Sequence, residues 1–277
     1  MVTNNNKVII FDTTMRDGEL APGVQMNLAD KISIAQLLEK MGVDAIEVGY
    51  PGRYKKDFQE IFKISQIIKQ AIICGLASAD REEIMTVGQA IKQAEKGRIH
   101  TYISVNLKEN KVGEERVLTA IKDSVSLARN YCDDVEWSAF DAPRSDREFL
   151  CRALELAILS GATTINIPDS LGLLTPEEFS QLIAMIFNRV PNINDAMVSV
   201  HCHDDRGYAV DNAIAALDLG VRQIECAING LGARKGNAKL ETVVEKILEQ
   251  QKYKIEIDSS LMSAASDLVA RISGREN

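Results

Sequence analysis

The sequence predicts a single-domain α/β protein, a (β/α)8 TIM barrel, and three observations indicate this fold. Short runs of β-branched and other apolar residues alternate with segments in which apolar residues recur at helical spacing. Eight such strand–helix pairs follow one another in about 250 residues, a length that suits this barrel. No linker or low-complexity segment interrupts the series. A doubly wound open sheet is the alternative, because alternating strands and helices also build that fold.

The eight predicted strands are short, and helical segments separate them. This order gives a parallel sheet. Along the chain the strands are residues 8–11 (VIIF), 45–49 (AIEVG), 71–76 (AIICGL), 98–105 (RIHTYISV), 134–140 (DVEWSAF), 163–167 (TTINI), 197–201 (MVSVH) and 222–227 (RQIECA).

Each predicted strand is followed by a predicted helix. The clearest helix start is Thr175, which can cap the helix, because Pro176 suits the first turn and Glu178 completes a capping box. Residues 1–254 would form the barrel, and residues 255–277 a C-terminal helical extension. The helices are expected within residues 27–41, 55–69, 81–95, 114–130, 147–159, 175–189, 208–219 and 239–250.

The composition and charge of the chain exclude several kinds of protein. Of the 277 residues, 45% are hydrophobic and 26% are charged, which is typical of a globular protein. The formal net charge of −8 argues against a nucleic-acid or anionic-membrane binder, since such proteins carry a basic field. The 5 scattered cysteines include no CxxC pair, so we expect reduced thiols. Without a signal-peptide pattern or an apolar run of about 18 residues, the protein is expected to be cytoplasmic.

Polar segments follow four of the predicted strands at their carboxyl ends, where the active site of such a barrel lies. Glu47 and Tyr50 are close enough to this rim to touch a substrate, although Glu47 could equally orient Arg16. The four segments are residues 12–19 (DTTMRDGE), 47–51 (EVGYP), 201–205 (HCHDD) and 229–237 (NGLGARKGN).

His201 and His203 are the strongest indication of a metal site. Residues two apart on a strand face the same side, so both imidazoles can point to one ion. Asp17 and Asn237 are the best-placed oxygen partners, and Asp204 could accept a hydrogen bond from an imidazole. Such a nitrogen–oxygen set suits Mn, Zn, Co, Fe or Mg. The alternative is a pair of histidines that are merely hydrogen-bonded.

A glycine-rich loop follows the last predicted strand, at residues 230–236 (GLGARKG). Its GxGxxxG spacing and late position disfavour a dinucleotide site. A glycine-rich loop before a helix can instead hold phosphate or carboxylate, with Gly230 and Gly232 as candidate contacts. Arg16, Arg234 and Lys235 would supply positive charge for an anionic ligand. The alternative is a tight loop that needs glycine for its shape alone.

Six stretches of the sequence also match a known family. They are residues 11–19 (FDTTMRDGE), 41–51 (MGVDAIEVGYP), 129–138 (RNYCDDVEWS), 161–172 (GATTINIPDSLG), 198–217 (VSVHCHDDRGYAVDNAIAAL) and 220–241 (GVRQIECAINGLGARKGNAKLE). With them the chain resembles the catalytic domain of 2-isopropylmalate synthases, within the metal-dependent barrels that include homocitrate synthase and hydroxymethylglutaryl-CoA lyase. The HCHDD and NGxGxRxGN segments are closer to the synthases, because the cysteine-bearing loop of the lyases is absent.

The resemblance implies an acyltransferase of leucine biosynthesis that condenses acetyl-CoA, or another acyl-CoA, with a 2-oxoacid. A divalent metal acts as a Lewis acid on the ketone, a base deprotonates the acetyl-CoA methyl group, and the enolate attacks the ketone before thioester hydrolysis. Arg16 matches the arginine that meets the 2-oxoacid, and Ser170 replaces a threonine that contacts its carboxylate. A homodimer is also implied. The residues that match the metal ligands are Asp17, His201, His203 and Asn237.

The general base is left open by the sequence. His100 falls near the start of a predicted strand, at the stability face of the barrel, so we expect it to be structural. No histidine then remains for the base that the family obtains from its linker region. The candidates are Glu19, Glu47, Tyr50 and metal-bound water.

The chain departs from the family pattern at four places. Leu20 stands where an amide is usual, Phe140 and Ala233 stand where glutamates are usual, and the loop at residues 105–111 lacks the usual histidine. A buried Phe140 would favour a smaller or drier pocket. The sequence also stops where the linker of the family begins, so we expect leucine inhibition to be absent from this chain.

Two other functional hypotheses remain open. One is a retro-aldol or retro-Claisen lyase acting on a 2-hydroxy or 2-oxo acid or an acyl-CoA, because lyases of this group are single barrels of about this size. The other is a metal-binding pseudoenzyme or a catalytically incomplete short form, which the four departures motivate.

Overall fold

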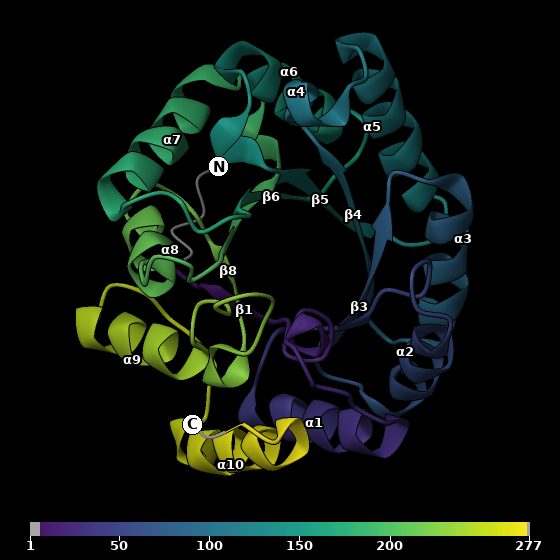
Figure 1. Ribbon diagram of the computed structural model, residues 1–277, viewed down its shortest axis with the longest axis vertical. Helices are drawn as coiled ribbons and strands as arrows, with labels where there is room; N and C mark the ends of the chain where they lie inside the picture. Colours follow the sequence, from purple (N-terminus) through teal and green to yellow (C-terminus); the bar gives the residue numbers. More distant parts are fainter. Residues whose placement is uncertain (1–5, 276–277) are drawn as a thin grey trace.

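The computed structural model describes residues 6–275, and its strands close into a parallel barrel surrounded by helices (Figure 1). Each strand pairs with the next in sequence, and β8 closes the barrel against β1, with Gln223 opposite Ile9. The predicted (β/α)8 barrel is confirmed, and the open sheet is excluded. The strands are β1 (Ile9–Asp12), β2 (Ala45–Gly49), β3 (Ile72–Ser78), β4 (Gly97–Ser104), β5 (Asp134–Phe140), β6 (Thr164–Asp169), β7 (Met197–Cys202) and β8 (Gln223–Cys226).

A helix follows every strand and covers the outside of the barrel (Figure 1). The capping box predicted at Thr175 is present, with Glu178 completing it. Asn27 and Asp30 form a similar box, and that helix ends at Gly42, whose φ of 89° suits glycine. The helices are α1 (Leu28–Met41), α2 (Lys56–Ile67), α3 (Arg81–Ala90), α4 (Leu107–Asn110), α5 (Glu114–Ala128), α6 (Arg147–Leu159), α7 (Pro176–Arg189), α8 (Ala209–Leu217), α9 (Leu240–Gln250) and α10 (Met262–Ser273).

The main apolar core lies between the strands and the helices, whereas the barrel interior is largely polar. Phe11, Ala45 and Cys74 form a small separate apolar cluster. The Arg98 guanidinium lies over the Phe11 ring and donates to Glu136 Oε2 at 2.8 Å. Both charged groups are buried, and their pairing offsets the loss of water. This polar interior leads up to the carboxyl ends of the strands.

The C-terminal helix α10 packs against α1 and beside the short turn at Ile228–Gly230 (Figure 1). Asn229 Nδ2 donates to the Ser266 carbonyl at 3.0 Å, and Ser266 Oγ donates to Asn229 Oδ1 at 2.6 Å. Dividing the chain into a barrel at 1–254 and an extension at 255–277 stays a prediction. In the described part of the chain, no helix is long and apolar enough to span a bilayer.

Candidate metal-binding active site

A cavity of about 1140 Å³ opens at the carboxyl ends of the strands. Its walls also include the loop after β1 and the first turns of α1 and α2. Glu47, Gly230, Gly232 and Asn237 lie outside the cavity lining. The predicted site residues that line it are Arg16, Asp17, Tyr50, Ser170, His201, His203 and Arg234.

Three of the predicted metal ligands come together at one end of this cavity. The possible ligand atoms of Asp17, His201 and His203 all lie within 4.8 Å of one another, and the three side chains are buried. The two histidine Nε2 atoms are 3.2 Å apart. Asn237 joins them from the loop after β8, because its Nδ2 donates to Asp17 Oδ2 at 2.7 Å.

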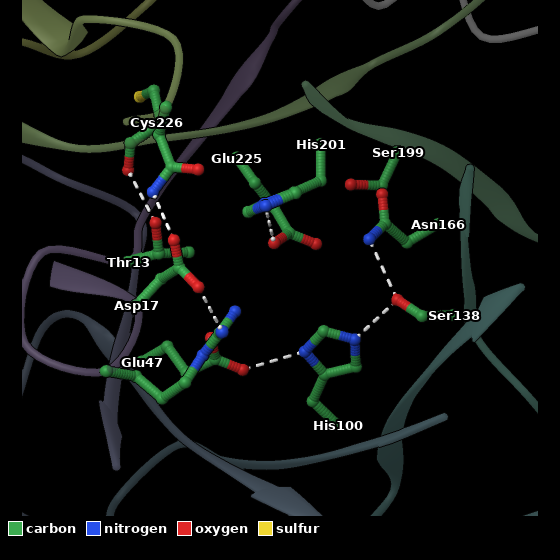
Figure 2. Close-up of polar contacts among 12 residues, drawn as sticks. Thr13, Asp17, Glu47, His100, Ser138, Asn166, Ser199, His201, Glu225 and Cys226 are labelled. Carbon is green, nitrogen blue, oxygen red and sulfur yellow. Dashed lines mark hydrogen bonds and ion pairs between the residues drawn. The ribbon is translucent and has the colours of Figure 1, made fainter. Parts of the chain in front are cut away.

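The second ring nitrogen of each histidine faces an acceptor. His201 Nδ1 lies 2.9 Å from Glu225 Oε2 (Figure 2), and His203 Nδ1 lies 3.2 Å from the Gly236 carbonyl. These contacts favour a proton on each Nδ1 and a lone pair on each Nε2. Burial lowers the pKa of both histidines to about 4, so both rings are neutral at neutral pH. Neutral imidazole is the form that binds a metal.

The sequence does not point to Glu225, and it offers Asp204 only as a possible acceptor for an imidazole. Asp204 Oδ1 instead accepts the backbone N–H of Ala209, the first residue of α8. Glu225 makes the contact with His201 instead. The available signal was the alternation of Gln223 and Glu225 in a strand, which places two polar side chains on the interior face.

The four predicted ligands fit a divalent cation. Asn237 Oδ1 is buried and has no hydrogen-bond partner among residues 6–275, which is unusual for a buried polar atom. Although burial opposes it, the neighbouring Arg16 guanidinium holds the pKa of Asp17 well below its usual range. The site therefore offers one carboxylate, one amide oxygen and two imidazoles, a donor set that binds transition metals and zinc.

The glycines of the loop after β8 bring its backbone close to this site. A Cβ on Gly232 would lie 2.8 Å from Asp17 Oδ2, which is too close for any other residue without movement. Gly230 has a φ of 63°, and its carbonyl accepts the Asn237 N–H at 2.9 Å. Because neither glycine lines the cavity, the structure gives them a role in the shape of the loop.

Arg234 and Ser170 lie together on another wall of the cavity. Arg234 donates to the Ser170 carbonyl at 2.8 Å and pairs with Asp205, also at 2.8 Å. Ser170 Oγ accepts the Asp141 N–H at 3.0 Å. The positive charge predicted for this rim is therefore present, and Asp205 partly neutralises it.

Arg16 is fixed from two sides. Its Nε lies 2.5 Å from Glu47 Oε2, and its NH1 lies 2.8 Å from Asp17 Oδ1. Although burial opposes it, Arg16 together with His100 lowers the pKa of Glu47 to about 2. Glu47 is thus a carboxylate that orients Arg16, which is one of the two roles expected for it.

His100 lies inside the barrel and lines the cavity, so the expectation of a place at the stability face is wrong. Its Nδ1 lies 2.7 Å from Glu47 Oε1, and its Nε2 lies 2.6 Å from Ser138 Oγ (Figure 2). Although burial opposes it, Glu47 raises the pKa of His100 to about 9. Barrel strands are staggered along the axis, so a residue near the start of one strand can lie deep in the barrel. His100 pairs with Glu136 of β5, in the polar interior.

Two other candidates for the base are held in unfavourable states. Glu19 contacts Lys31 at 2.8 Å and Lys56 at 2.7 Å, and these ammonium groups lower its pKa although burial opposes them. The Tyr50 hydroxyl donates a hydrogen bond to Glu83 Oε2 at 2.8 Å. Burial raises the pKa of Tyr50 above its usual range, so the phenol stays protonated.

Lys31 is a further residue near the site that sequence reasoning missed. It is fully buried in α1, where its Nζ donates to the Val48 carbonyl at 2.9 Å. The same ammonium lies 2.8 Å from Glu19 Oε2 and 2.7 Å from Glu60 Oε2. Lysines on barrel helices are normally solvated, so no local pattern signals this position.

Two of the departures from the family pattern lie on the cavity wall as exposed apolar side chains. Phe140 is 43% exposed and Leu20 is 39% exposed, and both line the cavity. The prediction of a buried Phe140 is wrong, because this residue ends β5 at the wall of the cavity. Ala233 also lines the cavity. The loop after β4 forms α4, a short helix that was not predicted.

Known proteins share this fold and much of this sequence. A 2-isopropylmalate synthase of Methylorubrum populi is 44% identical over 272 residues, which are 96% of this chain and 52% of that protein. One from Rhodopseudomonas palustris is 46% identical over 275 residues, covering 97% and 52%. The chain thus spans about half the length of these curated relatives.

A solved structure of hydroxymethylglutaryl-CoA lyase from Pseudomonas aeruginosa superposes with a TM-score of 0.82 at 19% identity, covering 99% of this chain and 96% of that one. This similarity supports the fold alone. The family model described as HMGL-like matches residues 7–269, nearly the whole chain. The chain therefore belongs to the HMGL-like family.

Proposed function

We propose that this chain catalyses a metal-dependent, Claisen-type condensation of acetyl-CoA, or another acyl-CoA, with a 2-oxoacid. This is a reaction of the 2-isopropylmalate synthase type. The observation that carries the proposal is the convergence of a carboxylate, an amide and two neutral imidazoles beside a fixed arginine. Identity of 44% and 46% to two proteins named 2-isopropylmalate synthase supports it.

Asp17, His201, His203 and Asn237 would hold the divalent cation, and Mn, Zn, Mg and Co are all compatible with these donors. When bound, the cation supplies Lewis acidity toward the ketone of the 2-oxoacid. Glu225 keeps His201 in one orientation, since the carboxylate accepts from its Nδ1.

Arg16 is the residue that we assign to the oxygen atoms of the 2-oxoacid. Its guanidinium lies beside Asp17 and lines the cavity, so it can donate to an oxygen that gains negative charge. Glu47 fixes this guanidinium from behind, and a donor held in place before the reaction needs little reorganisation. Ser170 and Arg234 are assigned to the substrate carboxylate, and Tyr50 to the far wall. In this proposal, Gly230 and Gly232 shape the loop and do not contact the substrate directly.

One experiment tests the reaction. The purified protein is incubated with each metal, acetyl-CoA and a panel of 2-oxoacids, and free thiol is followed by absorbance. Thiol release that needs both the metal and an oxoacid is the expected result. Cleavage of a 2-hydroxy acid or an acyl-CoA without condensation would show that the chain is a lyase and reject the proposal. Metal binding without either activity would show that the chain binds a metal but does not catalyse the reaction.

A second measurement tests the ligand assignment directly. His203→Ala is expected to abolish binding of Mn²⁺ in calorimetric titration, because it removes one of the two adjacent imidazoles. Glu245→Gln, an exposed position on α9, is the matched control and should bind as wild type. Unchanged stoichiometry in His203→Ala would reject the assignment.

Two further properties are proposed from the family resemblance alone. They are a cytoplasmic location and a homodimer, and sedimentation of the purified protein tests the second.

A further inference from the structure

The cavity has an aromatic wall, formed by Tyr50, Tyr102 and Phe140, at some distance from the metal ligands. The rings of Phe140 and Tyr102 have centroids 6.0 Å apart and are tilted by 56°. The rings of Tyr102 and Tyr50 are 6.2 Å apart, edge to face. All three residues line the cavity, so β4, β5 and the residue after β2 together present an aromatic surface to it.

The aromatic wall is held in place from outside the cavity. The Tyr50 hydroxyl donates to Glu83 Oε2 at 2.8 Å and lies 3.3 Å from the Tyr102 hydroxyl. These contacts fix the polar ends of the two tyrosines, of which Tyr50 is buried and Tyr102 is half-buried. Phe140 completes the wall with 43% of its surface exposed. A large exposed ring in a cavity marks a place where apolar ligand surface can be buried.

The aromatic wall stands directly above the polar layer that holds Arg16. Tyr102 follows His100 by two residues on β4, and Phe140 follows Ser138 by two residues on β5. Residues two apart on a strand share a face and are about 7 Å apart. His100 contacts both Ser138 and Glu47, and Glu47 fixes Arg16.

Arg16 and Arg234, two of the cations that line the cavity, are assigned above to the head group of the 2-oxoacid. Lys56 pairs with Glu19, and Arg53 lies over the ring of Tyr54, 5.6 Å from its centroid. The aromatic wall itself consists of uncharged side chains, so it suits an apolar group and not a second carboxylate.

We infer that the aromatic wall binds the side chain of the 2-oxoacid and selects a large apolar, aromatic side chain. The inference rests on the proposed condensation, in which Arg16 receives the oxygen atoms of the same substrate. A 2-oxoacid whose head group lies at Arg16 places its side chain one layer higher, against Phe140 and Tyr102. Aromatic pairs add attraction beyond the area that they bury, so an aromatic side chain gains most.

The test compares phenylpyruvate, pyruvate and 2-oxoglutarate as co-substrates of acetyl-CoA with the metal-loaded protein. We expect phenylpyruvate to have the highest kcat/KM. Phe140→Ala should lower kcat/KM about tenfold for phenylpyruvate and less than twofold for pyruvate, and Phe140→Leu should restore part of the loss. Leu248→Ala, an exposed apolar residue outside the cavity, is the matched control and should change neither value.

Equilibrium binding of phenylpyruvate and pyruvate to the Mn²⁺-loaded protein separates this inference from the proposed reaction. A preference for phenylpyruvate that Phe140→Ala removes supports the aromatic wall, even if no thiol is released and the condensation is rejected. Equal affinity for both acids overturns the inference. A rise of the KM for acetyl-CoA in Phe140→Ala, equal with every oxoacid, also overturns it, because the wall would then contact the acyl-CoA.

Discussion

Arg16 Nε lies 2.5 Å from Glu47 Oε2, and this contact joins the metal end of the cavity to the polar interior of the barrel. The other oxygen of Glu47 lies 2.7 Å from His100 Nδ1. The orientation of the guanidinium therefore depends on a carboxylate that does not itself line the cavity. This arrangement makes Glu47 a positioning residue whose loss should affect both stability and catalysis.

Glu47→Gln keeps the shape of the side chain and removes its charge. Arg16 and His100 would then be buried with one fewer carboxylate, and breaking a buried pair costs about 3 kcal/mol or more. We expect the free energy of unfolding, measured with urea at pH 7, to fall by about this amount. Glu245→Gln, an exposed position, is the control. A change below about 0.5 kcal/mol, as at ordinary surface sites, would contradict the prediction.

His100 should make stability depend on pH. Although burial opposes it, Glu47 raises the pKa of His100 to about 9. A histidine in the unfolded chain has a pKa of about 6.5. A raised pKa gives stabilisation that is complete below about pH 6.5 and is lost as the pH rises through about 9. The difference in unfolding free energy between wild type and His100→Gln should therefore shrink between pH 6.5 and 9. A difference that is constant or grows over this range would contradict the prediction.

NMR gives a direct check of the same group. The chain has only three histidines, so the ring signals can be assigned by substitution. The His100 ring should titrate near pH 9, well above a free histidine. A midpoint of about 6.5 would show that Glu47 does not stabilise the protonated form of the His100 ring.

The parts of the structure that follow local rules could be predicted from the sequence. The barrel followed from alternating strand and helix patterns, and His201 and His203 followed from their spacing of two on one strand. Asp17 and Asn237 could be added because the ends of parallel strands meet at one rim. These predictions need no knowledge of how far each strand is displaced along the barrel axis.

The parts that depend on packing between distant segments could not be predicted. The depth of His100 depends on the stagger of β4 against its neighbours, and a residue near a strand start therefore reached the cavity. The buried Lys31 depends on carboxylates from the loop after β1 and from α2. The exposure of Phe140 depends on which side chains flank the end of β5. None of these contacts leaves a periodic signal in the sequence.

Lys31 should be among the most important single residues for stability near the cavity. Replacing it by Met keeps the length of the side chain but leaves the half-buried Glu19 and the buried Glu60 with one fewer cation. We expect Lys31→Met to lower the free energy of unfolding by about 3–5 kcal/mol. Lys40→Met, an exposed position at the end of α1, should change it by less than about 0.5 kcal/mol. Equal effects of the two substitutions would reject a specific role for the buried ammonium.

Helix α10 contacts the loop that carries Asn237 through the side chains of Ser266 and Asn229. Ser266 Oγ donates to Asn229 Oδ1 at 2.6 Å, and Asn229 holds a left-handed φ of 57°. The next residue, Gly230, accepts the N–H of Asn237 at 2.9 Å. The conformation of Asn229 therefore fixes the turn at Gly230, whose carbonyl positions the backbone of the proposed ligand Asn237.

Ser266→Ala removes the hydroxyl that donates to Asn229 Oδ1. A hydrogen bond is worth about 1 kcal/mol, so the Kd for Mn²⁺ should rise about fivefold in calorimetric titration. Ser266→Thr keeps the hydroxyl and should restore the affinity, whereas Ser263→Ala, exposed on the same helix, should leave it unchanged. If Ser266→Ala lowers thermal stability but leaves the Kd within twofold, α10 only supports the fold. If the Kd rises as expected and threonine restores it, the position of Asn237 depends on a helix that follows the last strand by more than thirty residues.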